Sequence, residues 1–200
     1  MRNFVCVVEL IPESYVGCLD VEKIFGRVAP LHVDLGCGDG MFLCDLAKRM
    51  PERNFLGIER LLGRVRSASH KTAGVNNVRV LRAETSYAVR YLLPKNSVEI
   101  FHLLFPDPWP KRRHHQRRIF TANFMSAIAA ALMKNGVLRV ATDESDYFKH
   151  IAKLAGQSRE FAVSEVNDHC HFPVSTFEKK FKNNGVNIHR LELRKISPVR

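Results

Sequence analysis

The chain has 200 residues, 46% of them hydrophobic, which is enough for one well-filled core, and no low-complexity stretch divides it. No apolar run approaches the roughly 20 residues that a membrane-spanning helix requires, so we expect a soluble protein without a membrane partner. The formal charge of +11 attracts polyanions, and nucleic acid is therefore the leading class of partner.

The cysteines and histidines give no sign of a disulfide framework or a metal site. The five cysteines are odd in number, and no two of them form a Cys-x-x-Cys pair. His169, Cys170 and His171 are consecutive, but alternate residues of an extended segment point to opposite faces, and no second ligand cluster accompanies them. We therefore expect reduced thiols in a cytoplasmic protein that holds no metal.

Short apolar runs alternate with helix-length segments from residue 31 to about residue 155, which is typical of a parallel sheet covered on both faces. The predicted strands of this part are residues 31–35, 54–58, 78–81, 98–105 and 137–142. A helix that carries Phe120, Phe124 and Ile128 precedes the last of these strands, and we expect Gly136 to be its C-cap. Residues 161–166 and 188–193 are predicted as two further strands. The pattern predicts a doubly wound α/β fold.

A glycine loop follows the first of these strands and precedes a helix, the context in which such a loop binds a ligand. Its sequence runs from Asp34 through Gly36, Gly38 and Gly40, so the spacing is G-x-G-x-G. Met41 stands where a dinucleotide-binding loop would place its last glycine, which argues against a nicotinamide cofactor. A tight helix entry without that fingerprint favours a nucleoside bearing an amino acid, such as S-adenosylmethionine.

Two carboxylates follow later strands. Glu59 ends the second strand, 21 residues after Gly38, where it can accept hydrogen bonds from ribose hydroxyls. Glu84 lies just beyond the third strand and can accept from an adenine amino group, although a helix cap is the alternative for this residue taken alone. Asp34 is predicted to lie near the amino-acid end of the ligand.

The most informative segment follows the fourth strand. Residues 105–110, Phe-Pro-Asp-Pro-Trp-Pro, form a proline loop that leads into a basic run at residues 111–118. In a doubly wound sheet this loop emerges beside the glycine loop, so Asp107 should face the methyl donor. The prolines limit the conformations of the loop and position Asp107 and Trp109. The cations that follow fit phosphates, and the tryptophan ring could stack a base. A rigid packed turn and a solvated charge run are the alternatives.

The proline loop with its basic run, the Ala-Thr-Asp sequence ending at Asp143 and the Thr-Phe-Glu sequence ending at Glu178 resemble the bacterial tRNA (guanine-N7)-methyltransferases. The resemblance runs from about residue 31 to residue 193. It implies a Rossmann-like class I methyltransferase with a mainly parallel sheet and an antiparallel last strand. It also implies S-adenosylmethionine as the cofactor and a guanosine in the variable loop of tRNA as the substrate.

The resemblance and the glycine loop together assign roles to individual residues. Asp107 is the expected catalytic residue. Cofactor contacts are expected from Asp34, Gly36, Gly38, Gly40, Glu59, Glu84 and Asp107. Substrate contacts are expected from Lys111, Asp143, Ser175, Thr176, Phe177 and Glu178. RNA contacts are expected from Arg113, His114, His115, Gln116, Arg117 and Arg118.

The chain departs from the family pattern at several of these positions. Asp34 stands where Glu is usual, Glu84 where Asp is usual, and Pro110 where another residue is usual. Ser175 and Thr176 replace Thr-Lys, and Thr176 thereby removes a positive charge. We expect residues 1–200 to form one domain: an N-terminal extension without an assigned role up to residue 30, shorter than in relatives and lacking their flanking contacts, a cofactor-binding core at 31–155, and substrate-binding strands at 156–200.

Three other functions compete with this interpretation. A methyltransferase for an exocyclic base amine would also carry a proline loop after the fourth strand, but without the long cationic continuation. A non-catalytic RNA-binding protein on the same scaffold would bind RNA without the methyl donor. A nicotinamide oxidoreductase is disfavoured by the spacing of the glycines.

Overall fold

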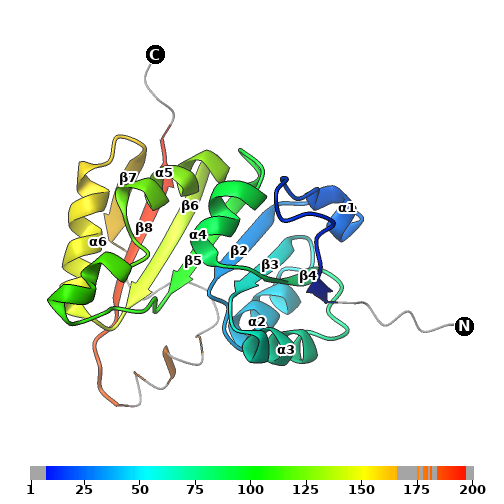
Figure 1. Cartoon of the computed structure of the whole chain (residues 1–200), viewed down its shortest axis with the longest axis horizontal. Helices are drawn as coiled ribbons and strands as arrows, with labels where there is room; N and C mark the ends of the chain where they lie inside the picture. The colour runs from blue at the N-terminus through cyan, green and yellow to red at the C-terminus, as the bar shows by residue number, and fades with distance from the viewer. Residues whose placement is uncertain (1–7, 166–174, 176–177, 180, 182–183, 197–200) are drawn as a thin grey trace, which may run out of the picture.

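The apolar runs of the sequence form a twisted sheet. The structure is a computed structural model, and it describes residues 8–165, 175, 178–179, 181 and 184–196. Eight strands lie within these residues, in the order β1-β4-β3-β2-β5-β6-β8-β7 (Figure 1). Their bounds are β1 (Glu9–Leu10), β2 (Leu31–Leu35), β3 (Asn54–Glu59), β4 (Val78–Arg82), β5 (Val98–Leu104), β6 (Leu132–Thr142), β7 (Phe161–Glu165) and β8 (His189–Lys195).

The described helices connect these strands and cover the sheet. They are α1 (Val21–Phe25), α2 (Met41–Arg49), α3 (Leu62–Lys71), α4 (Thr85–Tyr87), the π-helical η1 (Ala88–Leu92), the 3₁₀ helix η2 (Arg112–Arg117), α5 (Ala122–Ala131) and α6 (Ser145–Gln157). None of them is long and apolar enough to cross a membrane. The strands from β1 to β6 pair in parallel, whereas β8 runs antiparallel to both β6 and β7. The predicted doubly wound sheet with an antiparallel last strand is confirmed.

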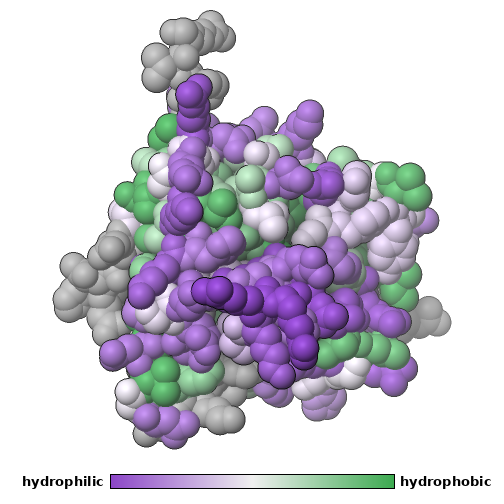
Figure 2. All heavy atoms as spheres, turned by 60° about the vertical axis from the view of Figure 1, so that its left-hand side comes forward, coloured by the Kyte–Doolittle hydropathy of each residue, from purple (hydrophilic) through white to green (hydrophobic). Residues whose placement is uncertain are grey.

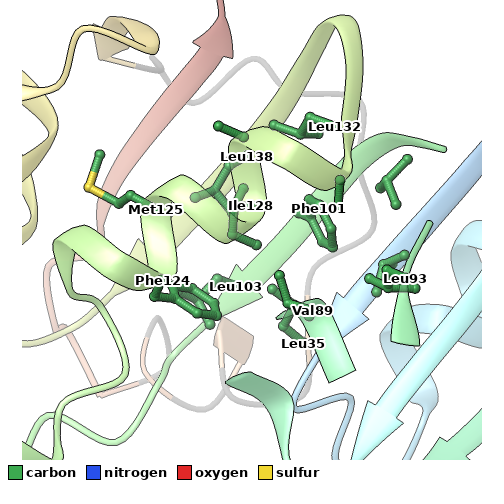
Figure 3. Packing of buried hydrophobic residues seen from close by; sticks show 14 of the residues in the cluster. Leu35, Val89, Leu93, Phe101, Leu103, Phe124, Met125, Ile128, Leu132 and Leu138 are labelled. Carbon is green, nitrogen blue, oxygen red and sulfur yellow. The ribbon is translucent and has the colours of Figure 1, made fainter. Parts of the chain in front are cut away.

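Buried side chains pack on both faces of the sheet, because each strand alternates its residues between the two faces. Leu31, Val33 and Leu35 of β2 belong to a core shared with η1, α5 and α6. In that core, side chains from η1, β5 and α5 converge, with Phe101 and Phe124 among the largest (Figure 3). A second core forms under α2 and α3. Asp34 alternates with the residues of the first core and so lies on the α2 side.

Gly136 is not the C-cap of α5, and that prediction was wrong. The helix ends at Ala131, and Leu132 is already extended and pairs with Val98 in the sheet. The chain then shifts register before it rejoins β5, and Asn135, with φ at 62°, takes the left-handed turn position. A Cβ on Gly136 would lie 3.0 Å from the Glu99 carbonyl oxygen, so the bulge leaves little room for a side chain at this position.

The strand order reverses between β2 and β5. From β2 the chain continues to β3 on one side, and β5 pairs with β2 on its other side. Loops that leave neighbouring strands in opposite directions open a crevice at the carboxyl edge of a doubly wound sheet. The glycine loop after β2 and the proline loop after β5 therefore meet at this switch point, as the sequence predicted.

Candidate active site

Two adjoining cavities open at the switch point. One, of about 510 Å³, extends toward β4 and is lined by Gly36, Glu59, Glu84 and Asp107 among others; we refer to it as the β4-side cavity. The other, of about 540 Å³, extends toward β6 and is lined by Asp34, Gly36, Gly38, Asp107, Asp143 and Ser175 among others; we refer to it as the β6-side cavity. Gly36 and Asp107 line both cavities, so the two loops form a shared wall.

The glycine loop has a backbone that only glycine adopts readily. Gly36, Gly38 and Gly40 have φ values of 80°, 57° and 76°. Gly40 is also the N-cap of α2, and a Cβ there would lie 2.8 Å from the Cβ of Ala68 on α3. The amide of Gly36 donates a 2.8 Å hydrogen bond to the Ile58 carbonyl of β3, which fixes the loop against the sheet.

Glu59 ties the glycine loop to the end of β3. Its side chain is buried, and its carboxylate accepts hydrogen bonds from the amides of Gly38 (3.2 Å) and Leu61 (2.8 Å). The Arg64 guanidinium of α3 lies 3.9 Å from the same carboxylate. Each carboxylate oxygen keeps a second lone pair, so Glu59 can still accept hydrogen bonds from a ligand in the β4-side cavity.

Asp34 carries a buried carboxyl group beside the glycine loop. Only 4% of its surface is exposed, and no described residue donates a hydrogen bond to its side chain. Burial, with the nearby Glu59 carboxylate as a second cause, raises the pKa of Asp34 to about 7. A cation bound in the β6-side cavity would satisfy this carboxylate and lower its pKa.

Glu84 acts as the N-cap of the helical turn α4. Its carboxylate accepts hydrogen bonds from the amides of Ser86 (3.0 Å) and Tyr87 (2.7 Å). The residue is exposed and lines the β4-side cavity. The cap that the sequence offered as an alternative is therefore present, and a contact with adenine stays a prediction.

The proline loop is held in a strained backbone conformation beside the cavities. Phe105 and Trp109 have φ values of 53° and 44°, which are uncommon for side chains of this size. The Phe105 amide donates a 2.7 Å hydrogen bond to the Ala141 carbonyl of β6, and its ring packs 5.3 Å from that of Phe181. Asp107, between these two positions, is exposed to solvent and forms part of the wall that the two cavities share.

Trp109 already has cationic and aromatic neighbours from η2. The Arg117 guanidinium lies over its ring at 5.0 Å, and the His114 ring meets it edge-on at 5.8 Å. Trp109, Gln116 and Arg117 line the β4-side cavity. Trp109 thus forms part of the cavity wall, and stacking of a base on its ring stays a prediction.

The basic run continues from the proline loop onto the surface. Lys111, Arg112, Arg113 and Arg117 are exposed, and none of them forms an ion pair with a described carboxylate. Their helix, η2, lies beside α6, and Figure 2 brings that side forward to show a continuous patch of strongly hydrophilic side chains. Arg118 differs from the rest of the run, since only 3% of its side chain is exposed.

The residues expected to bind substrate are only partly brought together. Asp143 and Ser175 line the β6-side cavity, and the Ser175 hydroxyl accepts a 3.1 Å hydrogen bond from the Glu178 amide. Glu178 forms an ion pair with Arg190 of β8 and does not line either cavity. Lys111 also lies outside both linings. Thr176 and Phe177 lie outside the described residues.

Some cavity residues were missed by the sequence interpretation. Arg64 lines both cavities, and Phe181 lines the β6-side cavity. Arg64 could have been found, because it stands in the first turn of the helix that follows Glu59, where side chains return to the carboxyl edge of the sheet. Phe181 gave no such signal, since its place depends on contact with Phe105.

Within the part of the chain that the structure describes, no group of three or more His, Cys, Asp or Glu side chains is placed to hold a metal ion. His169, Cys170 and His171 lie outside that part.

Comparisons with known proteins agree with this fold. A family model described as putative methyltransferase matches residues 28–191. The tRNA (guanine-N(7)-)-methyltransferase of Leifsonia xyli is 39% identical over 188 residues, covering 89% of this chain and 82% of that protein. The protein of the same name from Thermotoga maritima is 35% identical over 192 residues, covering 94% of this chain, which spans 61% of that relative.

Solved structures show the same architecture at low sequence identity. The 16S rRNA methyltransferase KamB superposes with a TM-score of 0.62 at 16% identity, covering 90% of this chain and 95% of that one. At that identity the likeness concerns the fold alone. The family model and the relatives together establish that this chain belongs to the methyltransferase family that includes the tRNA (guanine-N(7)-)-methyltransferases.

Proposed function

We propose that this chain transfers a methyl group from S-adenosylmethionine to N7 of a guanosine in tRNA, and that it does so in the cytoplasm. The observation that carries the proposal is the wall shared by two cavities, because Asp107 borders both of them. The nucleoside part of the methyl donor can then lie in the β4-side cavity, with its amino-acid part reaching Asp34 past the shared wall, and the acceptor base can lie in the rest of the β6-side cavity. The names of the relatives support guanine N7 as the acceptor.

The residues around the glycine loop fit such a donor. Glu59 would accept hydrogen bonds from the ribose hydroxyls, and Glu84 would accept from the adenine amino group. Asp34, which is buried and accepts no hydrogen bond from a described residue, would face the ammonium group of the amino-acid part. The β4-side cavity, at about 510 Å³, lies within the range of cofactor sites. When bound, the donor supplies an electrophilic methyl carbon on its sulfonium.

Asp107 would stabilise the reacting base electrostatically. N7 of guanine carries an in-plane lone pair, so no proton has to leave it before attack, and a strong general base is unnecessary. The Asp107 carboxylate would accept hydrogen bonds from the guanine N1–H and amino group. These bonds strengthen as the ring becomes cationic, so they favour the transition state over the ground state. The strained, proline-rich backbone would hold the carboxylate in place for this task.

The exposed cations of η2 would bind the tRNA backbone. Arg113 and Arg117 are exposed, and both follow Asp107 closely along the chain. Phosphate contacts of this kind supply affinity without reading sequence. Asp143 and Ser175, in the β6-side cavity, would contact the base or its ribose.

The proposal is tested by incubating the protein with labelled S-adenosylmethionine and unmodified tRNA, followed by nucleoside analysis. We expect 7-methylguanosine as the labelled product. A tRNA that carries 7-deazaguanosine at the target position lacks the accepting nitrogen and should remain unlabelled.

Other outcomes of this experiment would overturn the proposal. Labelled N2-methylguanosine would identify an enzyme for an exocyclic amine. Binding of tRNA without binding of the donor, measured by calorimetry, would identify an RNA-binding protein without this activity.

A further inference from the structure

We propose that Arg118, which the family resemblance groups with the RNA-contacting residues, is a positioning residue that holds the proline loop and so aims the Asp107 carboxylate. This inference rests on the proposed function. Its basis is a set of contacts that only Arg118 makes among the cations of the basic run, within the part of the chain that the structure describes.

Arg118 is buried and its guanidinium is bonded on two sides. Its Nε donates a 2.8 Å hydrogen bond to the carbonyl oxygen of Pro108, the residue directly after Asp107. Its Nη2 donates a 2.9 Å hydrogen bond to Oδ2 of Asp146 in the first turn of α6. The guanidinium also lies 4.7 Å from the ring centroid of Tyr147, which is fully buried. A side chain engaged in this way is not available to a phosphate.

The proline loop depends on an anchor of this kind. Three of the six residues from 105 to 110 are prolines, which have no backbone N–H to donate. Phe105 and Trp109 have left-handed backbones, a conformation that persists only where surrounding contacts enforce it. The Phe105 amide is held by β6 at the start of the loop. The Pro108 carbonyl, held by Arg118, supplies the second fixed point, so Asp107 lies between two anchors.

Asp146 and Tyr147 make the burial of Arg118 tolerable. A buried guanidinium needs a counter-charge and hydrogen-bond acceptors. The Asp146 carboxylate supplies the charge, and its hydrogen bond from Arg118 lowers the pKa of Asp146. The Tyr147 ring supplies a cation–π contact, and its hydroxyl accepts a hydrogen bond from the Phe120 amide at the entry to α5. Helix α6 thus reaches the catalytic loop through Arg118.

Arg117, the preceding residue, lies in a different environment from Arg118. Its side chain is exposed, lies over Trp109 and makes no ion pair with a described carboxylate. Adjacent residues of the same type therefore point to different environments, one open to a polyanion and one enclosed by protein. The pair provides a natural comparison for an experiment.

The test compares Arg118→Lys and Asp146→Asn with the wild type, using steady-state kinetics on tRNA, donor affinity by calorimetry and the salt dependence of tRNA binding. Arg118→Lys keeps the charge but loses the planar fork that joins Pro108 to Asp146. We expect kcat to fall by about 10- to 100-fold, because a displacement of about 1 Å costs that much, while KM for tRNA changes by less than about twofold. The salt slope of tRNA binding should stay unchanged.

Asp146→Asn distinguishes positioning from RNA contact by the sign of its effect. The substitution removes a negative charge from an exposed position, so an RNA-contacting Arg118 would bind tRNA equally well or better and turnover would not fall. A positioning Arg118 loses a partner, and kcat should fall by roughly threefold to tenfold with KM for tRNA unchanged. Lys153→Gln, which removes an exposed charge from the same helix, is the matched control and should leave kcat unchanged.

Several results would overturn the inference. An increase in KM for tRNA with kcat unchanged in Arg118→Lys would assign Arg118 to RNA binding. An unchanged kcat in Asp146→Asn would also contradict it. Thermal unfolding and donor affinity show whether each variant is folded. If Arg118→Lys does not fold, Asp146→Asn still tests the inference, because it changes an exposed carboxylate. A wild type that forms no 7-methylguanosine would refute the proposed function instead.

Discussion

The two loops that meet at the switch point reach fixed conformations in opposite ways. The glycine loop uses residues without a Cβ, so its left-handed backbone at Gly36, Gly38 and Gly40 carries little strain. The proline loop places left-handed backbone at Phe105 and Trp109, where it is costly, and relies on partners elsewhere in the chain to enforce it. One loop is determined by its own sequence, and the other by the structure around it.

The two loops should therefore affect stability and turnover differently. Changes in the glycine loop should act through local backbone strain and packing against α3. Changes around the proline loop should act on turnover, because its anchors lie on β6 and α6 and leave Glu59 and Asp34, the proposed donor-binding residues, untouched. Variants in the two regions should therefore separate binding and stability from catalysis.

The largest expected effect is that of Asp107→Asn. The amide keeps the size of the side chain but loses the negative charge that would stabilise a cationic guanine, so kcat should fall by about 100- to 1,000-fold. Affinities for the donor and for tRNA should change little, as calorimetry and binding assays can measure. Losses in binding as large as the loss in kcat would place Asp107 outside the chemical step.

Substitutions in the glycine loop should affect stability to different degrees. Gly36→Ala introduces left-handed strain in open space and should lower the free energy of unfolding by about 1–2 kcal/mol. Gly40→Ala adds a clash with Ala68 on α3 and should lower it by about 3 kcal/mol in total. Denaturant unfolding of the two variants measures the difference. Equal losses would mean that packing against α3 does not require glycine at position 40.

Donor binding should depend on pH through Asp34. In the free protein its pKa is about 7, so below that pH the carboxyl is largely protonated and must lose a proton to face an ammonium group. Donor affinity should therefore rise with pH up to about 7, by at most about tenfold per pH unit, and binding at pH 6 should release a proton. Calorimetry in buffers of different ionisation enthalpy measures this release.

The ionisation of Asp34 should also make the free energy of unfolding depend on pH. Its contribution should fall as the pH rises, whereas donor affinity should increase. Because the folded pKa of Asp34 lies above its unfolded value of 3.8, the native state binds the extra proton between about pH 4 and about pH 7. Its contribution to the free energy of unfolding is present below about pH 4 and is lost as the pH rises through about 7. Asp34→Asn should remove this dependence, and a variant that retained it would show that another group is responsible.

The smallest expected effect is on the salt dependence of tRNA binding. Four exposed cations of the basic run, Lys111, Arg112, Arg113 and Arg117, would give a slope of log K against log salt of about −3. Replacing any one of them with alanine should reduce the magnitude of the slope by somewhat less than about 1. Arg118→Lys should not change it. A slope that stayed constant in all four alanine variants would contradict phosphate binding by this surface.

Features encoded by local sequence could be predicted, and features that depend on distant partners could not. The strands and the glycine loop follow from residue periodicity and from the backbone freedom of glycine, so the sequence alone predicts the switch point. Arg118 looked like its neighbours, because its burial depends on Asp146, 28 residues further along. Gly136 was mistaken for a helix cap, because the bulge that requires it arises only when β6 pairs with β5.

The N-terminal elements show the same limit. Strand β1 has only two residues, Glu9 and Leu10, and forms because Val80 and Leu81 of β4 offer it an edge. Helix α1 is a single short helix between Asp20, its N-cap, and Gly26, its C-cap. Neither has a repeating hydrophobic pattern of its own, so the sequence left residues 1–30 without assigned structure.

The proposed function requires that Asp107 faces the reacting end of a donor held by the glycine loop. A crystal structure of the chain with S-adenosylhomocysteine tests this directly. We expect the Asp107 carboxylate beside the sulfur atom, the ligand's ammonium group within hydrogen-bond distance of Asp34, and the ribose at Glu59. A ligand bound away from the shared wall, with Asp107 directed into solvent, would contradict the claim.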